Sequence, residues 1–168
     1  LNLVENLLSV TQIQTKNSKL NMSPEILDEV VAEAVTRMKK RMPDIKIDVE
    51  VPTEILMIPM DAMLIEQVLI NLMENALTHS HGSRPIRLIA ENQLDNIQIR
   101  VIDYGVGLNE DQLEHIFDGT YSETTHSDVH KGMGIGLSLC QSIITAHHGT
   151  ISARNHGEGA EFLFTLPK

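Results

Sequence analysis

Hydrophobic residues recur along the chain with two different periods, and each period predicts a different kind of element. Residues 1–10 and 61–80 carry apolar side chains three and four positions apart, the spacing that places them on one face of a helix. Residues 45–51 alternate apolar and charged positions, which is the pattern of a half-buried strand. An α/β fold is therefore expected.

Capping residues set the expected boundaries of the helices. Ser-Pro-Glu at residues 23–25 is typical of a helix start, and this helix is expected to reach residue 42. Asp61 is the expected N-cap of the helix over residues 61–80. A further helix over residues 134–148 is expected to stop at Gly149 in the left-handed conformation.

Short apolar runs predict a mixed sheet with helices covering one of its faces. Residues 54–58 are expected to be the partner strand of residues 45–51. Two hairpins are expected, one from strands at 85–90 and 96–102 and one from strands at 150–154 and 161–166. A short strand at 19–21 and a short helix at 110–117 complete the pattern. The whole pattern predicts an α/β (α+β) two-layer sandwich.

Two segments depart from this regular pattern. Residues 118–131 are polar and long for a connection inside a compact domain, which favours a mobile lid over an ordinary linker. The chain starts without Met inside a helical pattern that the polar residues 15–18 end, which indicates a piece of a longer protein. We therefore expect residues 1–16 to be the end of a separate helix and residues 19–168 to form the domain.

Composition narrows the classes of function. The chain has 168 residues, enough for one domain with its own core, and aromatic residues make up only 3%, so stacking of nucleic-acid bases on aromatic rings is not expected. A net charge of -10 argues against a nucleic-acid partner and against an anionic membrane surface. The negative net charge does not exclude ATP as a ligand. At physiological salt, charges more than about 8 Å away are screened, so a few local hydrogen-bond donors outweigh a distant acidic surface. The single cysteine, Cys140, excludes an internal disulfide and favours a reducing compartment.

The helix over residues 61–80 carries a polar stripe. Asn71, Glu74, Asn75 and Thr78 are spaced by three and four residues and share one side of the helix. An Asn amide oxygen suits Mg²⁺, which takes few protein ligands beside water and phosphate oxygens, and a Glu carboxylate is able to polarise or deprotonate an attacking group. The alternative is a solvent-facing stripe that binds no ligand.

Asp103 follows an apolar strand and precedes two glycines. Its carboxylate is placed to accept a hydrogen bond from an adenine amino group, while Gly105 and Gly107 let the backbone turn tightly around a flat ligand. A simple Asp turn is the alternative. Tyr104 either shields the base or covers the sheet.

Three more glycines, Gly132, Gly134 and Gly136, lead into a helix whose first amide groups are suited to phosphate. Their spacing differs from the dinucleotide fingerprint, and the sequence contains no Gly-Lys-Ser/Thr phosphate loop. Lys131 is a candidate phosphate contact, with an unattached surface lysine as the alternative. Metal binding by the pairs His126 with His130 or His147 with His148 is not favoured, because neither pair belongs to a ligand set of known spacing.

In their order along the chain, these segments resemble the N, G1, F, G2 and G3 boxes of sensor histidine kinases. The matching residues are Asn71-x-x-Glu74-Asn75-Ala76, Asp103-x-Gly105-x-Gly107, Phe117, Gly132-x-Gly134-x-Gly136-Leu137 and Gly157-x-Gly159. Residues 3–9, 59–61 and 64–70 narrow the resemblance to the potassium-responsive members of the family. The resemblance implies a Bergerat-type sandwich that binds ATP and Mg²⁺ beneath a mobile lid, in the cytoplasmic part of an inner-membrane kinase.

The resemblance also implies roles for individual residues. Asn75 would hold Mg²⁺, Asn71 would support the metal and the phosphates, and Glu74 would assist transfer of the γ-phosphate to a histidine. Asp103 would receive the adenine amino group. The other implied nucleotide contacts are Gly105, Gly107, Lys131, Gly132, Gly134, Gly136 and Leu137.

The implied partners are ATP, a response regulator and the phosphoacceptor domain of the same kinase, whose last helix would end in residues 1–16. Neither nucleic acid nor direct membrane contact is expected. The chain lacks a phosphoacceptor His box, so it is not expected to phosphorylate itself.

Departures from the family pattern leave other interpretations open. Thr78 and His79 stand where the family usually has Lys and an aromatic residue, and the lid start at residues 117–120 lacks a second Phe. Losing one charge-assisted hydrogen bond costs about 1.5–3 kcal/mol, which is about ten- to more than a hundredfold in affinity. The first alternative is a degenerate nucleotide-binding or signalling module with weak or no kinase activity. The second is an ATP-driven conformational machine of the gyrase or MutL type.

Overall fold

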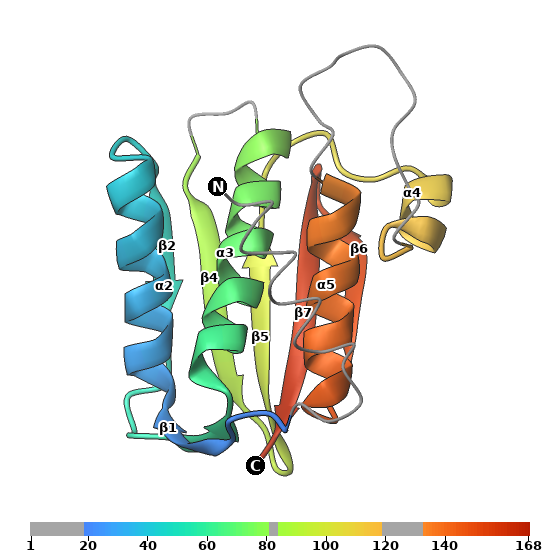
Figure 1. Ribbon diagram of the computed structural model, residues 1–168. Coiled ribbons are helices and arrows are strands. Elements are labelled where there is room, and N and C mark those ends of the chain that lie inside the picture. Colours follow the sequence, from blue (N-terminus) through green and yellow to red (C-terminus); the bar gives the residue numbers. More distant parts are fainter. Residues whose placement is uncertain (1–18, 81–83, 119–132) are drawn as a thin grey trace.

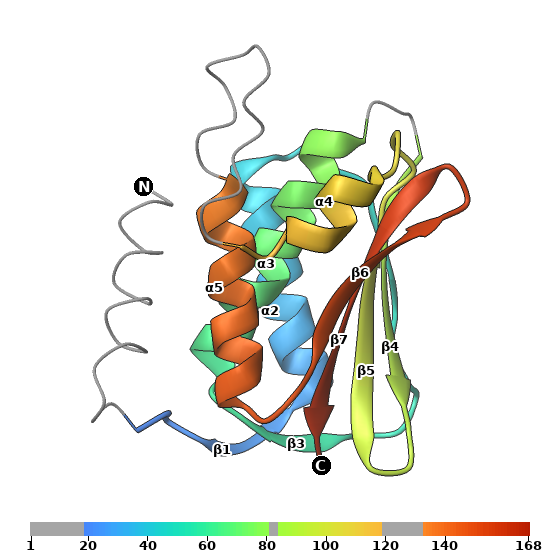
Figure 2. The same cartoon turned by 90° about the vertical axis from the view of Figure 1, so that its right-hand side faces the viewer.

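The computed structural model describes residues 19–80, 84–118 and 133–168, which form two layers, a sheet and a set of helices that cover one of its faces (Figures 1 and 2). The strands are β1 (Ser23–Ile26), β2 (Ile47–Glu50), β3 (Met57–Met60), β4 (Ile86–Asn92), β5 (Asn96–Ile102), β6 (Ile151–His156) and β7 (Gly159–Pro167). The helices are α2 (Leu27–Arg41), α3 (Ala62–His79), α4 (Glu110–His115) and α5 (Met133–Ala146). The predicted α/β two-layer sandwich is confirmed.

The main sheet has the strand order β2-β4-β5-β7-β6. Its β2–β4 pair is parallel and the other three pairs are antiparallel, so the sheet is mixed as predicted. The two expected hairpins are β4 with β5 and β6 with β7. A parallel pair requires a crossover connection, and the chain between β2 and β4 supplies it with β3 and α3.

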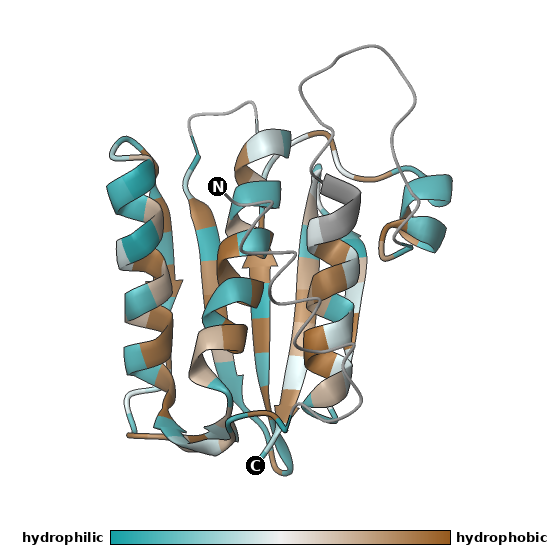
Figure 3. Cartoon of the chain, viewed as in Figure 1, coloured by the Kyte–Doolittle hydropathy of each residue, from teal (hydrophilic) through white to brown (hydrophobic). Residues whose placement is uncertain are grey.

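The core lies between the sheet and the helices and is mainly aliphatic. Phe162, Phe164 and Leu166 alternate along β7 and are at most 1% exposed, because every second side chain of a strand faces the same layer. On the helical side, α3 contributes Leu69 and Leu72, both fully buried. Figure 3 shows that α2 is hydrophobic on the side toward α3 and hydrophilic on its outer side.

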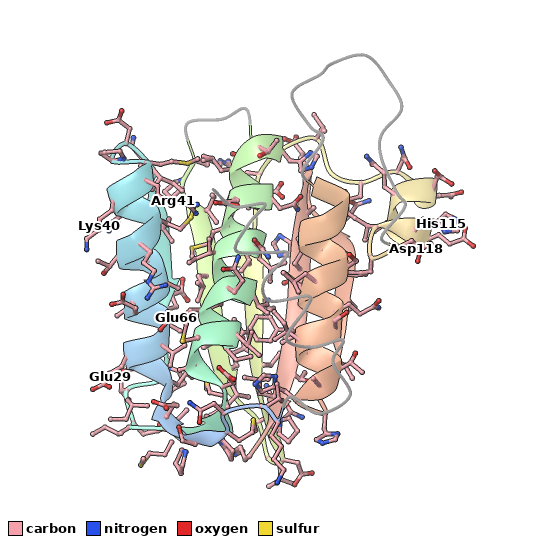
Figure 4. All side chains as sticks on the ribbon, viewed as in Figure 1. Glu29, Lys40, Arg41, Glu66, His115 and Asp118 are labelled. Carbon is pink, nitrogen blue, oxygen red and sulfur yellow. The ribbon has the colours of Figure 1, made fainter. Side chains whose placement is uncertain are left out.

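Two ion pairs join α2 to α3. Arg37 lies 3.4 Å from Glu66, and Arg41 lies 2.7 Å from Glu74. Figure 4 labels Glu66 on α3 and Arg41 at the end of α2. Burial, only partly offset by the charge of Arg37, raises the pKa of Glu66.

The expected helix start at residues 23–25 is wrong. These residues belong to β1, which pairs with β3 so that Pro24 lies opposite Pro59, and α2 begins only at Leu27. The expected strand at 19–21 therefore ends two residues before β1 begins, and the partner of β2 is β4 rather than the segment at 54–58. Strand pairing across long sequence distances overrode the local capping signal.

The expected stop of α5 at Gly149 is also wrong in detail. The residue with positive φ is His148, at 61°. Gly149 is required for a different reason, since a Cβ there would lie 1.9 Å from the carbonyl oxygen of Thr165 in β7. By contrast, Asp61 caps α3 as predicted, and its carboxylate accepts a hydrogen bond from the N–H of Leu64 at 3.3 Å.

Some predictions fall outside the described residues. They concern the helix end at residues 1–16 and nearly all of the lid at 118–131. Within the part of the chain that is described, no helix combines the length and the apolar character that a membrane span needs.

Glu161 lies on the face of the sheet opposite the helices and is fully buried between two arginines. Its carboxylate accepts hydrogen bonds from Arg100, at 3.1 Å, and from Arg154. Burial by itself raises the pKa of Glu161, but the two arginines outweigh it and the pKa is lowered from the ordinary 4.5. The ion cluster thus stabilises the fold whenever Glu161 is ionised.

We expect this cluster to make the domain acid-sensitive. Because the pKa of Glu161 is lower in the folded than in the unfolded chain, its stabilising effect is complete above pH 4.5 and is lost as the pH falls toward the lowered value. Urea unfolding between pH 6 and pH 3 should show a shallower loss of free energy of unfolding in Glu161→Gln than in the wild type. Equal slopes for the two proteins would contradict this account.

Candidate nucleotide-binding site

Asn75 provides the clearest sign of a ligand site on α3. Its side chain is 5% exposed, and both the oxygen and the nitrogen of its amide are buried without a hydrogen-bond partner among the described residues. Buried polar atoms are rarely left unpaired, because each costs free energy. A bound metal ion would satisfy the amide oxygen, and a water molecule of its shell would accept a hydrogen bond from the amide nitrogen, so the residue fits its expected role as a Mg²⁺ ligand.

Asn71 lies one turn earlier and connects α3 to α5. Its Oδ1 accepts a hydrogen bond from Gln67 at 3.1 Å, and its Nδ2 donates to the carbonyl oxygen of Gly136 at 3.5 Å. Asn71 is 7% exposed. The structure therefore brings together two predicted site residues that are 65 positions apart in the sequence.

Glu74 and Thr78 have different surroundings from the two asparagines. The carboxylate of Glu74 pairs with Arg41 on α2, and the hydroxyl of Thr78 is exposed and donates to the carbonyl oxygen of Glu74 at 2.9 Å. The alternative of a solvent-facing stripe without a ligand does not fit Asn71 and Asn75, which are buried. Within the stripe, Thr78 faces solvent and Glu74 is partly exposed.

Asp103 lies at the end of β5 and is 1% exposed. Its Oδ1 accepts hydrogen bonds from the N–H groups of Gly105, at 3.0 Å, and Ala160, at 3.2 Å. Its Oδ2 is buried and has no partner among the described residues. One oxygen thus fixes the orientation of the carboxylate, and the other is available to accept a hydrogen bond from a ligand.

The glycines after Asp103 let three segments approach one another closely. A Cβ at Gly105 would lie 1.9 Å from the carbonyl oxygen of His79, so only glycine lets this turn meet the end of α3. Gly107 has φ of 75°. A Cβ at Gly159 would lie 2.0 Å from the carbonyl oxygen of Asp103, which explains the glycine at the start of β7.

Asn155 is a supporting residue that the sequence analysis missed. Its amide accepts from the N–H of Leu108 at 2.7 Å and donates to the carbonyl oxygen of the same residue at 2.9 Å. This double contact fixes the loop after Gly107 against β6. The sequence signal that could have identified Asn155 is its position two residues before the turn at Gly157.

Tyr104 lies beside two arginines near the start of β4. The guanidinium of Arg84 lies over its ring at 5.2 Å from the ring centre, and Arg87 of β4 interacts electrostatically with it. Phe117, the residue that resembles the F box, packs edge-on against Phe162 with ring centres 6.3 Å apart. The core thereby holds the chain where it leaves α4.

An ion pair lies beside Phe117. His115 Nδ1 is 2.9 Å from Asp118 Oδ2, and Figure 4 shows both residues at the outer end of α4. This hydrogen bond raises the pKa of His115.

Of the expected phosphate contacts, Lys131 and Gly132 lie outside the described residues, whereas Gly134 and Gly136 lie in the first turns of α5 and Leu137 is buried.

The remaining chemical groups offer no second site within the described ranges. No group of three or more His, Cys, Asp or Glu side chains there is arranged to hold a metal ion. Burial raises the pKa of Cys140 to about 12, so its thiol stays protonated. His147 is 2% exposed, and both of its ring nitrogens have partners within the protein.

Sequence relatives of this chain are sensor kinases. Sensor protein KdpD of Clostridium acetobutylicum is 42% identical over 168 residues, which is 99% of this chain and 19% of that protein. KdpD of Escherichia coli K12 is 36% identical over 167 residues, or 99% of this chain and 18% of that protein. The chain thus spans about a fifth of the length of these relatives.

Solved structures show the same fold. The catalytic domain of histidine kinase ThkA matches with a TM-score of 0.78 at 28% identity, over 88% of this chain and 96% of that chain. ThkA in complex with the response regulator protein TrrA matches with a TM-score of 0.78 at 26% identity, over 99% of this chain and 48% of that chain.

The family model described as histidine kinase-, DNA gyrase B- and HSP90-like ATPase matches residues 60–168, the part that contains Asn71, Asn75, Asp103 and the start of α5. The chain belongs to this family of ATPases and is an ATP-binding catalytic domain of the sensor histidine kinase type.

Proposed function

We propose that this domain, within a KdpD-like sensor kinase, positions the γ-phosphate of Mg-ATP for attack by a histidine on the dimerisation and phosphoacceptor domain of the same kinase. The observation that carries the proposal is that the amide of Asn75 and Oδ2 of Asp103 are among the buried polar atoms that have no hydrogen-bond partner in the described part of the chain. These atoms match the two ends of ATP, because one suits a phosphate-bound metal ion and the other suits the adenine amino group.

Each part of the nucleotide then meets a separate element. Oδ2 of Asp103 accepts a hydrogen bond from the adenine amino group, and the turn at Gly105 and Gly107 lies along the base. The phosphates meet the N-terminal end of α5 at Gly134 and Gly136, where unpaired N–H groups favour anions. We propose that Lys131, Gly132 and Leu137 complete this contact.

Asn75 and Asn71 would hold Mg²⁺ beside the phosphates, and the ion would neutralise the charge that develops during phosphoryl transfer. Most of the catalysis is then positioning of the reacting groups. The complex of ThkA with the response regulator TrrA supports a response regulator as the next phosphate acceptor of the parent kinase. We place this domain in the cytoplasm, because ATP and such a partner are found there.

Asn75→Ala tests the metal site. We expect the variant to keep its melting temperature and to lose the Mg²⁺-dependent part of its affinity for a non-hydrolysable ATP analogue, measured by calorimetry with and without Mg²⁺. Asn92→Ala, which changes an exposed Asn at the end of β4, is the control and should bind as the wild type does. Undiminished Mg²⁺-dependent binding by Asn75→Ala would remove Asn75 from the site.

Glu74 is proposed to assist the transfer step, with Arg41 holding its carboxylate in place at 2.7 Å. We expect Glu74→Gln to leave the affinity for the ATP analogue within about twofold, since Glu74 contributes no binding contact in this scheme. In the parent kinase the same change should slow autophosphorylation at saturating ATP, and Arg41→Met should slow it less. If Glu74→Gln autophosphorylated at the wild-type rate, Glu74 would have no part in the transfer step. Its ion pair with Arg41 would then only link α2 to α3.

The degenerate module remains the second candidate, and Thr78 is the observation that favours it. Its exposed hydroxyl is hydrogen-bonded to the backbone of its own helix, so α3 offers no cation at this position. We expect Thr78→Lys to raise ATP affinity about tenfold or more, the value of one charge-assisted hydrogen bond.

Thr36→Lys is the matched control for this change. Thr36 is also an exposed helical Thr with its hydroxyl bonded to the carbonyl four residues earlier, but it lies on α2. A gain in both variants would indicate a general charge effect. No nucleotide binding by the wild type, together with none by Thr78→Lys, would contradict the kinase assignment and favour the degenerate module.

A further inference from the structure

A buried histidine joins the last turn of α5 to the start of α3. His147 Nδ1 lies 2.8 Å from the carbonyl oxygen of Ile143, and Nε2 lies 3.0 Å from the backbone nitrogen of Asp61. A backbone carbonyl only accepts and a backbone N–H only donates, so the ring carries its proton on Nδ1 and accepts at Nε2. Both ring nitrogens are therefore used in holding two helices together.

Asp61 is the capping residue of α3, which makes this contact a link between helix ends. Its Oδ1 accepts from the N–H of Leu64 at 3.3 Å, and its Oδ2 accepts from the N–H of Asn21 at 3.0 Å. The network thus includes the cap of α3 and the chain that leads into β1. Figure 1 shows the start of α3 and the end of α5 at the same end of the molecule.

The end of α5 is also held against the sheet. The N–H of Gly149 donates to the carbonyl oxygen of Ile144 at 2.9 Å, and the backbone of Gly149 packs so closely on β7 that a Cβ would lie 1.9 Å from the carbonyl oxygen of Thr165. Two independent contacts, one to α3 and one to β7, therefore fix the position of this helix end.

The opposite end of α5 lies in the nucleotide site. The helix has 14 residues and, at 1.5 Å per residue, is about 20 Å long. A helix of this length moves largely as a unit, so a shift of its last turn along the axis also moves its first turns. There the carbonyl oxygen of Gly136 meets Asn71 at 3.5 Å.

We propose that His147 is a positioning residue for nucleotide binding: it sets the axial position of α5 and thereby the placement of the phosphate-binding end of α5 relative to Asn71 and Asn75. This inference rests on the proposed function of the site. His147 itself touches no ligand, because its contacts lie at the far end of the helix.

The test compares three variants of the 168-residue chain. His147→Leu removes both hydrogen bonds and keeps a buried apolar side chain. Ile144→Ala, on the same turn and fully buried, removes apolar packing but no hydrogen bond of the network. His147→Gln restores one donor and one acceptor. Affinity for a non-hydrolysable ATP analogue with Mg²⁺ is measured by calorimetry, and the melting temperature of each variant shows how far it is destabilised.

We expect His147→Leu to weaken nucleotide binding about tenfold. This is the effect of losing one hydrogen bond between the nucleotide and the displaced end of α5. Ile144→Ala should melt at a lower temperature but bind as the wild type does, and His147→Gln should recover part of the lost affinity. Equal loss of affinity in His147→Leu and Ile144→Ala would overturn the proposal, because general destabilisation would then explain both. Unchanged binding by His147→Leu would overturn it as well.

A second measurement reads the helix position without nucleotide. In NMR spectra of the same variants, the backbone amide of Gly136 and the side-chain amide of Asn71 should shift in His147→Leu and stay unchanged in Ile144→Ala. If the wild type bound no nucleotide, the proposed function would fail, whereas these shifts would still decide whether His147 positions α5. Unshifted resonances in His147→Leu would overturn the inference.

Discussion

The site depends on the hydrogen bonds that the carboxylate of Asp103 accepts from neighbouring backbone N–H groups. They join the end of β5 to the start of β7, because Oδ1 accepts from both Gly105 and Ala160. The two glycines that flank this point, Gly105 and Gly159, allow a backbone approach that no other residue would permit. As a result Oδ2 is buried and oriented and has no partner in the described part of the chain, which is what recognition of an adenine amino group requires.

The other half of the site depends on how α3 and α5 pack on that sheet. The apolar side of α3 is buried in the core, and this places Asn71 beside the first turns of α5, with Asn75 one turn further along α3. The burial of the Asn75 amide without a hydrogen-bond partner among the described residues costs folding free energy, which a bound metal ion and nucleotide would offset. Ligand binding at this site is thus expected to raise the free energy of unfolding of the domain.

Local sequence signals predicted much of this arrangement. The cap at Asp61, the two hairpins, the mixed sheet and the helices on one face all follow from periodicity and turn residues. The pairing of β1 with β3 could not be predicted in this way, because it joins segments 30 or more residues apart and overrides a good capping sequence at Ser23. The roles of His147 and Asn155 were missed for the same reason, since their partners, Asp61 and Leu108, are distant in sequence.

Calorimetric titration of the wild type and of Asp103→Asn with a non-hydrolysable ATP analogue, in the presence of Mg²⁺, tests the central claim most directly. The substitution keeps an acceptor oxygen for Gly105 and Ala160 and replaces only the unpaired oxygen by an N–H donor. The account predicts saturable binding by the wild type, and loss of that binding in a variant whose melting temperature is unchanged. Equal affinity of the two proteins would show that Asp103 does not recognise the base and would contradict the account.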